Sequence, residues 1–301
     1  MSSQEMELAE AQSAVSPQRG WRRLLSRTLI GSQRNPTLAF GLIILVIMAV
    51  VAIISPFITG EAILTSFEDR LISPSIDGFW FGTDNFGRDV YARTLQGSRI
   101  SLLVGFSVAL LVTVFGLIFG LISGYIRVVD NVLMRVMDGM MAMPTILLAL
   151  AIITLLGSSV QNVIIVITIV DTPRMVRIVR GATLSLREQM FVDAAEAVGV
   201  PVWRILVFHI APNTIAAVLV QATFVFAAAI LTEAALSFLG AGTPPIIPSW
   251  GNIMGEGRQY LQVAFWITFF PGLFLSVTVL AINLAGDGLR DILDPRLRHR
   301  G

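Results

Sequence analysis

The sequence contains no cysteine and no lysine, and its 301 residues include only two histidines. Without cysteine there can be no disulfide framework, thiolate nucleophile or cysteine-ligated metal. Without lysine there is no Walker A motif, so we expect that this chain is not itself a P-loop ATPase. His209 and His299 lie far apart and form no HExxH pattern, which argues against a zinc site. The sequence therefore predicts neither a catalytic centre nor a metal site.

Charged residues are also scarce, at 14% of the chain, whereas 55% of the residues are hydrophobic and the mean hydropathy is +0.78. Soluble domains carry about 25% charged residues, so this composition predicts a polytopic membrane protein. The net charge of +1 provides no basic excess that would favour nucleic acid.

Six stretches are long and apolar enough to cross a bilayer, whose hydrocarbon core of about 30 Å needs roughly 20 helical residues. Helices are expected because a helix satisfies its own backbone hydrogen bonds in lipid. The fourth stretch has the weakest pattern, since it contains Asp171 and Pro173. The expected fold class is an all-α polytopic membrane protein with six transmembrane helices. The predicted spans cover residues 38–58, 100–126, 136–156, 160–179, 214–239 and 263–285.

The arginines predict the orientation of these spans. With the amino terminus inside, sixteen of the 21 basic residues lie on the inner side. Arginine resists translocation, so this bias predicts that both termini face the cytoplasm. We expect residues 1–36 to form a cytoplasmic tail, because a cleaved signal peptide would place its apolar core earlier. The outer arginines are Arg70, Arg88, Arg93, Arg99 and Arg258.

One charged segment, VDAAEAVGVPVWRILVFHIAPN, separates the fourth and fifth spans. Its first part predicts a short helix over residues 191–198, with Asp193 and Glu196 on one face. Gly199 can adopt the left-handed conformation that ends a helix, and Pro201 suits the first turn of a new one.

The second short helix of this segment is expected over residues 202–210, and Pro212 is expected to begin the fifth span. The result is a helix-glycine-helix elbow at the inner membrane face. Its small alanines allow another backbone to approach, and its two carboxylates can pair with a basic partner. A docking element and an ordinary solvated loop both fit this pattern.

Two carboxylates lie within predicted spans, where charge is costly and often functional. Glu233 could line a translocation path, or it could be a hydrogen-bonded structural group among small neighbours. Asp171 could form an ion network with Arg174 and Arg177, or it could contact substrate. Both alternatives stay open for each carboxylate.

The outer stretch GTDNFGRDVYARTLQG has the pattern of a helix start, with Thr83 or Asp84 as the cap. Arg88, Asp89 and Arg93 are expected on exposed faces. The acids lack the spacing of a calcium-binding EF-hand. At the other end of the chain, GDGLRDILDPRLRHRG predicts either a solvated tail or a contact with another subunit.

The charged inner segment resembles the EAA…G motif of ABC importer permeases, and its HIAPN is similar to the usual HILPN. Further stretches resemble the DppC/OppC-type permeases of peptide importers, and the resemblance runs from residue 35 to residue 297. The departures are Ala211 in place of leucine, Asp171 where an aromatic is common, and FWFGTD in place of HPLGTD. The resembling stretches are FGTDNFGRDVYARTLQGSRISLLVG, FLGAGTPPIIPSWGNIM, PGLFLSV and NLAGDGLRDILDPRL.

The resemblance implies the type I ABC importer permease fold. The subunit would belong to an ATP-driven importer of dipeptides or oligopeptides in the bacterial cytoplasmic membrane, with no ATPase site of its own. The implied regions are a cytoplasmic tail (1–36), a first helix and outer loop (37–98), a five-helix core (99–288) that includes a coupling segment (188–213), and a second cytoplasmic tail (289–301).

The resemblance also implies partners and site residues. The partners are a homologous DppB/OppB-type permease, two cytoplasmic ABC ATPases that bind ATP and Mg, an extracytoplasmic peptide-binding protein, and membrane lipid. No cofactor is expected on this chain. Asp193, Ala194, Ala195, Glu196, Gly199 and Pro201 would couple to the ATPases, Glu233 and Asp171 are candidates for the translocation path, and Asp84, Arg88 and Asp89 are candidates for contact with the binding protein.

Other functions remain open from the residues alone. The same subunit type imports nickel, glutathione or haem. A proton-coupled secondary transporter could use Glu233 and Asp171 as proton relays, although it would not need the elbow. An intramembrane hydrolase would require a nucleophile and a base, for which a chain without cysteine offers little.

Overall fold

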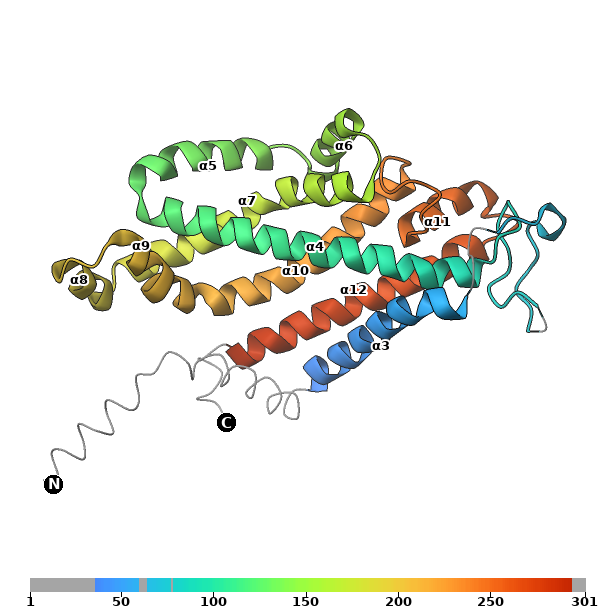
Figure 1. Ribbon diagram of the computed structural model, residues 1–301, viewed down its shortest axis with the longest axis horizontal. Helices are drawn as coiled ribbons and strands as arrows, with labels where there is room; N and C mark the ends of the chain where they lie inside the picture. Colours follow the sequence, from blue (N-terminus) through green and yellow to red (C-terminus); the bar gives the residue numbers. More distant parts are fainter. Residues whose placement is uncertain (1–35, 60–63, 77, 294–301) are drawn as a thin grey trace, which may run out of the picture.

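The computed structural model describes residues 36–59, 64–76 and 78–293, and within these ranges it contains helices and turns but no strand. The long helices run roughly parallel to one another along the molecule (Figure 1). The α-helices are α3 (Pro36–Ile58), α4 (Val90–Tyr125), α5 (Arg127–Met141), α6 (Thr145–Leu156), α7 (Val160–Arg187), α8 (Met190–Ala197), α9 (Val202–Ile205), α10 (Ala211–Phe238), α11 (Trp250–Gly257) and α12 (Trp266–Leu293). Short 3₁₀ turns occur at η2 (Phe67–Asp69) and η4 (Arg258–Tyr260), and η3 (Leu206–Ile210) is a π-helical turn.

Four helices of the described chain are long and apolar enough to cross a membrane by themselves. They are α3, α4, α12 and the continuous run from Val202 to Phe238 that ends with α10. These helices correspond to the first, second, sixth and fifth predicted spans, so the sequence located them correctly.

The third predicted span, 136–156, is wrong as a single helix. The chain bends by 95° between α5 and α6. Pro144 stands at the break with an extended ψ of 128°, and proline cannot supply the N–H that a continuous helix would need. The described chain therefore has a fifth apolar crossing only if α5 and α6 cross as one bent pair.

The fourth predicted span is an unbroken helix, α7, which continues through Pro173 to Arg187. Asp171 and several arginines interrupt its apolar pattern, so α7 is not among the apolar crossing helices. Six spans are thus not established by helix length and composition.

Helix α7 packs closely against α4 because glycine recurs at every fourth position of α4. A Cβ atom at Gly116, Gly120 or Gly124 would lie only 2.1 to 2.6 Å from a side-chain atom of α7. Small residues at this spacing let two helix backbones approach, which drives association where no water is present to be released. The α7 side chains that fill these positions are Met175, Val179 and Thr183.

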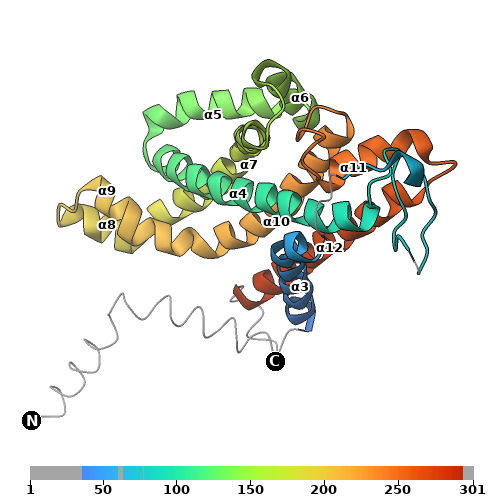
Figure 2. The same ribbon diagram turned by 45° about the vertical axis from the view of Figure 1, so that its right-hand side comes forward.

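The remaining helices surround this pair. Helix α10 packs against both α4 and α7, while α3 and α12 lie side by side on one flank (Figures 1 and 2). Helices α8 and α9 lie at one end of the molecule. Helix α11 and the described residues before α4 lie at the opposite end (Figure 1). The two predicted functional segments are therefore separated by the length of the long helices.

Pro212 lies in the first turn of α10, as expected for the start of the fifth span, but it does not begin a separate helix. The helix runs without interruption from Val202 through the π-helical turn η3 into α10, with Pro212 in the first turn of α10. A proline inside a helix removes one backbone donor and crowds the preceding turn, and a wider turn relieves that crowding. The Asn213 side chain donates to the carbonyl of His209 at 2.5 Å, which satisfies a backbone acceptor at this point.

Candidate functional site: an elbow, two buried carboxylates and an outer ion network

The elbow at the end of α7 has the predicted helix-glycine-helix form. Helix α8 ends at Ala197, and Gly199 has a φ of +81°. The Gly199 N–H donates to the carbonyl of Glu196 at 2.9 Å, and the Val200 N–H donates to the carbonyl of Ala195 at 3.0 Å. This pair of bonds is the Schellman arrangement that closes a helix through a left-handed residue. Pro201 then stands as the N-cap of α9, one residue before the first turn in which it was expected.

The elbow has an anchored face and a free face. Val192 of α8 and Ile205 of α9 are fully buried in the same apolar cluster as Val179 of α7. Ala195 is half-buried and packs against that cluster. The other predicted coupling residues are all exposed: Asp193, Ala194, Glu196, Gly199 and Pro201.

A small polar cluster connects the elbow to α4 and α7. The Tyr125 hydroxyl, at the end of α4, donates to Oε1 of Glu196. Arg187, at the end of α7, donates from Nη1 to the Tyr125 carbonyl at 2.8 Å, and its guanidinium carbon lies 5.0 Å from the centre of the Tyr125 ring. Sequence reasoning missed Tyr125 and Arg187. Their places in the sequence could have indicated them, because Tyr125 is the last residue of α4 and Arg187 the last residue of α7.

Ion pairs join α5 to α7 near the same end of the molecule. Arg180 pairs with both carboxylate oxygens of Asp130, and Arg177 donates to Asp138 at 2.7 Å. The Arg177 part of the expected network with Asp171 is therefore wrong, whereas Arg174 does interact electrostatically with Asp171. Arg177 reaches across to α5, where a carboxylate lies within range, instead of along its own helix.

Asp171 is buried in α7 with 4% of its surface exposed. Its Oδ2 atom has no hydrogen-bond partner within the described chain. Buried polar atoms are almost always paired, so an unpaired carboxylate oxygen is an exception that calls for an explanation.

Glu233 has the opposite surroundings. It is fully buried in α10, where its Oε1 accepts from the Ser237 hydroxyl at 2.7 Å and its Oε2 accepts from the Ser101 hydroxyl at 3.2 Å. Ser237 also accepts from the Thr243 N–H at 3.0 Å, and Ser101 accepts from the Trp250 N–H at 3.3 Å. Glu233 thus links α4, α10 and the start of α11 through hydrogen bonds.

The outer end of the molecule contains a buried ion network. Asp84 Oδ2 accepts from Arg88 Nε and from Arg93 Nη1, each at 2.6 Å. Both arginines also donate to Glu256 of α11. Asp84 is 0% exposed and Arg93 is 2% exposed, while the side chains of Arg88 and Glu256 remain partly exposed, so the buried pair is neutralised within a network of two positive and two negative charges.

The structure of this end of the molecule corrects two expectations. Arg93 does not lie on an exposed face, because its guanidinium is enclosed between two carboxylates. The cap of α4 is Asp89 instead of Thr83 or Asp84, since the Asp89 side chain accepts from the Tyr91 N–H at 2.9 Å. Burial raises the pKa of the Asp89 carboxyl, while hydrogen bonds from the Tyr91 and Ala92 backbones act in the lowering direction.

Of the predicted contacts for a binding protein, Asp84 is buried, whereas Arg88 and Asp89 are partly exposed. No group of three or more histidine or carboxylate side chains in the described ranges is placed to hold a metal ion.

Comparison with known proteins adds to this geometry. Residues 113–299 match the family of binding-protein-dependent transport system inner membrane components. The chain belongs to this family of binding-protein-dependent permeases. The matched residues include the elbow, Asp171 and Glu233. All three therefore lie in the part of the chain that resembles this family.

Individual permeases are similar to this chain over most of their length. A protein of Brucella abortus named as a peptide transport system permease is 48% identical, over 89% of this chain and 90% of its own. The dipeptide transport system permease protein DppC of Alkalihalophilus pseudofirmus is 43% identical, over 95% of this chain and 92% of its own. The glutathione transport system permease protein GsiD of Pectobacterium atrosepticum is 36% identical, over 92% of this chain and 90% of its own. This membership does not support the alternative of a proton-coupled secondary transporter.

Proposed function

We propose that this chain is the permease subunit of an ATP-driven importer that carries dipeptides or oligopeptides across the bacterial cytoplasmic membrane. The names of the similar peptide permeases support this cargo. Glutathione is the second candidate, because a glutathione permease is also similar along nearly the whole chain. In this proposal the chain performs no covalent chemistry, and ATP and Mg bind to partner subunits.

The observation that carries the proposal is the elbow. Its exposed face presents a slim helix end with Asp193 and Ala194, which suits insertion into a groove on a cytoplasmic ATPase. Its buried face is fixed by Val192 and Ile205, so the elbow can move only together with the helices that it contacts. A docked ATPase that closes would therefore displace α7 and α4.

The Tyr125 cluster strengthens that coupling. The hydrogen bond from Tyr125 to Glu196 connects the elbow directly to the inner end of α4, and Arg187 holds Tyr125 from α7. In the proposed mechanism this cluster keeps the elbow in register with the two central helices while ATP binding and hydrolysis alternately move it.

We propose a homologous permease as the partner within the membrane. Val128, Val132 and Val136 recur at every fourth position of α5 and are exposed, while the acids of α5 pair with α7 on its other side. Such an apolar stripe suits a second helical subunit. Between the two subunits, Asp171 is the better candidate for the translocation path, because Glu233 has its oxygens bonded internally.

The proposed topology has six crossings, with α5 and α6 together as the third and α7 as the fourth. Both termini then face the cytoplasm, and the elbow faces the ATPases. The opposite end would meet the peptide-binding protein. Arg88 and Asp89 are partly exposed there and can contact a partner. Asp84 is buried and would orient Arg88 through their hydrogen bond.

Uptake of a labelled dipeptide tests the cargo. Cells that lack this chain should lose uptake, and restoring the chain should restore uptake that depends on ATP hydrolysis. Competition by unlabelled dipeptide, glutathione, nickel and haem identifies the preferred cargo. Uptake that persists without ATP hydrolysis but collapses with the proton gradient would contradict the proposal.

The variant Tyr125→Phe tests the coupling. It deletes one hydroxyl, so the complex should assemble with its ATPases while the stimulation of ATP hydrolysis by loaded binding protein falls several-fold. Tyr260→Phe removes the same atom at the outer end of the molecule and should retain stimulation. Equal stimulation in the two variants would show that the Tyr125 bond does not take part in coupling.

A further inference from the structure

A groove runs along the flank of the molecule between α3 and α4. Its volume is about 750 Å³, within the range of roughly 300 to 1,000 Å³ that small-ligand sites occupy. The walls are almost entirely apolar. The α3 wall consists of Ala49, Ala52, Ile53, Pro56 and Phe57, and the α4 wall of Arg99, Leu102, Leu103 and Phe106.

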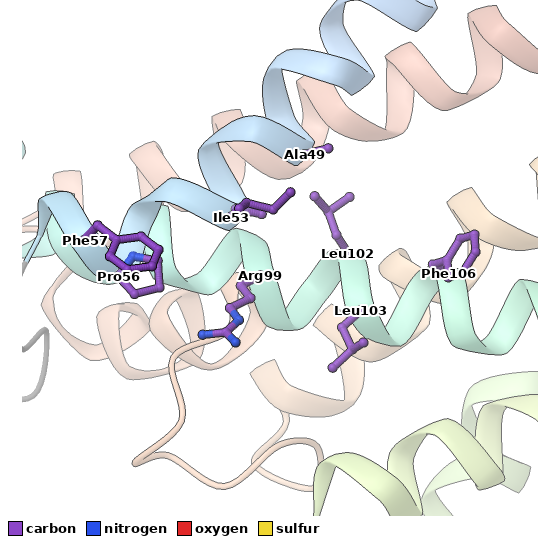
Figure 3. Close-up of a pocket in the computed structure, with 9 residues that line it drawn as sticks. Ala49, Ile53, Pro56, Phe57, Arg99, Leu102, Leu103 and Phe106 are labelled. Carbon is purple, nitrogen blue, oxygen red and sulfur yellow. The ribbon is translucent and has the colours of Figure 1, made fainter.

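Arg99 is the exception in this lining. Figure 3 shows its guanidinium projecting from α4 on the same side as Pro56 and Phe57 of α3, with Leu102 and Leu103 further along α4. The side chain is exposed, and none of the described carboxylates forms an ion pair with it. The contrast with Arg88 and Arg93 is direct, because those two arginines are neutralised by Asp84 and Glu256.

The groove lies where α3 ends. Thr59 follows the last residue of α3, and its hydroxyl oxygen accepts from the Gln96 side chain at 2.9 Å. Arg99 follows Gln96 by about one helical turn along α4, which places the guanidinium near the level at which α3 leaves the apolar layer. With the orientation proposed above, this is the outer boundary of the bilayer.

A charged side chain at this depth needs an anionic partner or water, because burial of an unpaired charge in hydrocarbon is costly. A guanidinium matches the geometry of a phosphate with two parallel hydrogen bonds. The apolar walls next to it suit a hydrocarbon chain, with Ile53, Leu103 and Phe106 all exposed.

We infer that this groove is a phospholipid site, in which Arg99 binds the headgroup phosphate and an acyl chain lies between α3 and α4. The charge complementarity at Arg99 selects a phospholipid over an uncharged lipid. The site is separate from the elbow and from both carboxylates, so it is an additional property of the subunit and not part of the proposed transport path.

The test uses the complete importer complex, purified with its partner subunits and titrated with phosphatidylglycerol or with diacylglycerol of the same chains. Native mass spectrometry reports the bound lipid. The wild-type complex should retain phosphatidylglycerol preferentially. Arg99→Ala should weaken this retention by about tenfold, because a charge-assisted bidentate contact is lost. Ala49→Phe should also weaken it by filling the groove.

Two control variants match these changes. Arg70→Ala removes an exposed arginine outside the groove, and Val50→Phe enlarges an exposed residue of α3 that does not line it. Both should bind lipid as the wild type does. If Arg99→Ala reduces the yield of complex, Arg99→Gln provides the same test with a polar side chain retained.

Wild-type lipid retention in both Arg99→Ala and Ala49→Phe would overturn the inference. A photo-crosslinker at Leu103 that captures the partner permease instead of lipid would also overturn it, because the groove would then be a subunit interface. Neither result would affect ATP-dependent peptide uptake, so failure of this inference is distinguishable from failure of the proposed function.

Discussion

At the scale of single residues, the surroundings of a charge decide its role. Arg93 and Arg99 lie six positions apart on α4, yet Arg93 is buried between two carboxylates and Arg99 faces an apolar groove. Glu233 and Asp171 differ in the same way, since both oxygens of the first accept hydrogen bonds, whereas one oxygen of the second has no partner among the described residues. Residue type alone does not distinguish the members of either pair.

Removing one charge from the outer network should be strongly destabilising. Asp84→Asn leaves Arg88 and Arg93 to share Glu256, and an uncompensated buried charge costs roughly 3 to 5 kcal/mol. Asp138→Asn breaks the exposed pair with Arg177 and should cost at most about 1 kcal/mol. The measurement is the apparent melting temperature of the purified complex in detergent. Equal shifts for the two variants would mean that the network contributes no more than a surface pair.

The left-handed conformation of Gly199 predicts a second residue-scale effect. A Cβ atom there would meet open space, so Gly199→Val should act through backbone strain of roughly 1 to 3 kcal/mol and redirect the exit from α8. Stimulated ATP hydrolysis and co-purification of the ATPases should both decrease.

Gly181→Val is the matched control, because Gly181 lies within α7 and its Cβ would also meet open space. This variant should retain bound ATPase. If Gly199→Val retains full stimulation as well, the conformation of the elbow is not required for coupling.

At the scale of helices, close packing decides which elements stay together. The glycines of α4 allow α7 to approach along three successive turns, so α7 is held by its neighbour although its own sequence is interrupted by charge. Helices α5 and α6 lack such a continuous path, because Pro144 separates them with a sharp bend.

Enlarging the middle glycine should separate α4 from α7. In Gly120→Val the new Cβ would lie 2.5 Å from the Cβ of Val179, and overpacking of this kind costs about 1 to 3 kcal/mol. Thermal stability of the complex should decrease. Adding Val179→Ala should recover only the part of the loss that comes from Val179 Cγ1, which would lie 2.7 Å from the new Cβ, because alanine keeps its own Cβ.

Gly139→Val provides the control for this pair, since nothing lies within 4 Å of a Cβ at Gly139 of α5. Its effect should be small. A double variant no more stable than Gly120→Val alone would show that the loss arises elsewhere than at this contact.

At the scale of the whole molecule, the elbow and the outer network lie at opposite ends of the same long helices (Figure 1). Helix α4 joins them directly, because Arg93 is near its start and Tyr125 is its last residue. A displacement of the elbow can therefore reach the outer end through one rigid element. This arrangement suits a protein whose two ends contact different partners.

Reporter fusions test the orientation of the molecule. Fusions after residues 20, 75, 195, 250 and 298 should report inside, outside, inside, outside and inside. A further fusion after residue 158 should report outside, since six crossings require α5 and α6 to cross the membrane together. An outside result at residue 195 would overturn the docking role of the elbow, and an inside result at residue 158 would exclude the six-span topology.

The sequence by itself determined the features that depend on local chemistry. Composition identified the apolar helices α3, α4, α10 and α12, and glycine and proline spacing located the elbow, because helix propensity and backbone conformation are set by a few neighbouring residues. The tertiary structure decided which side chains are paired. Arg93 with Glu256, Tyr125 with Glu196 and Arg177 with Asp138 are separated by 39 to 163 positions in the chain. Such pairs form only when helix packing brings distant residues within bonding distance, so the burial of Asp84 and the position of Arg99 at an apolar groove became visible only in the folded chain.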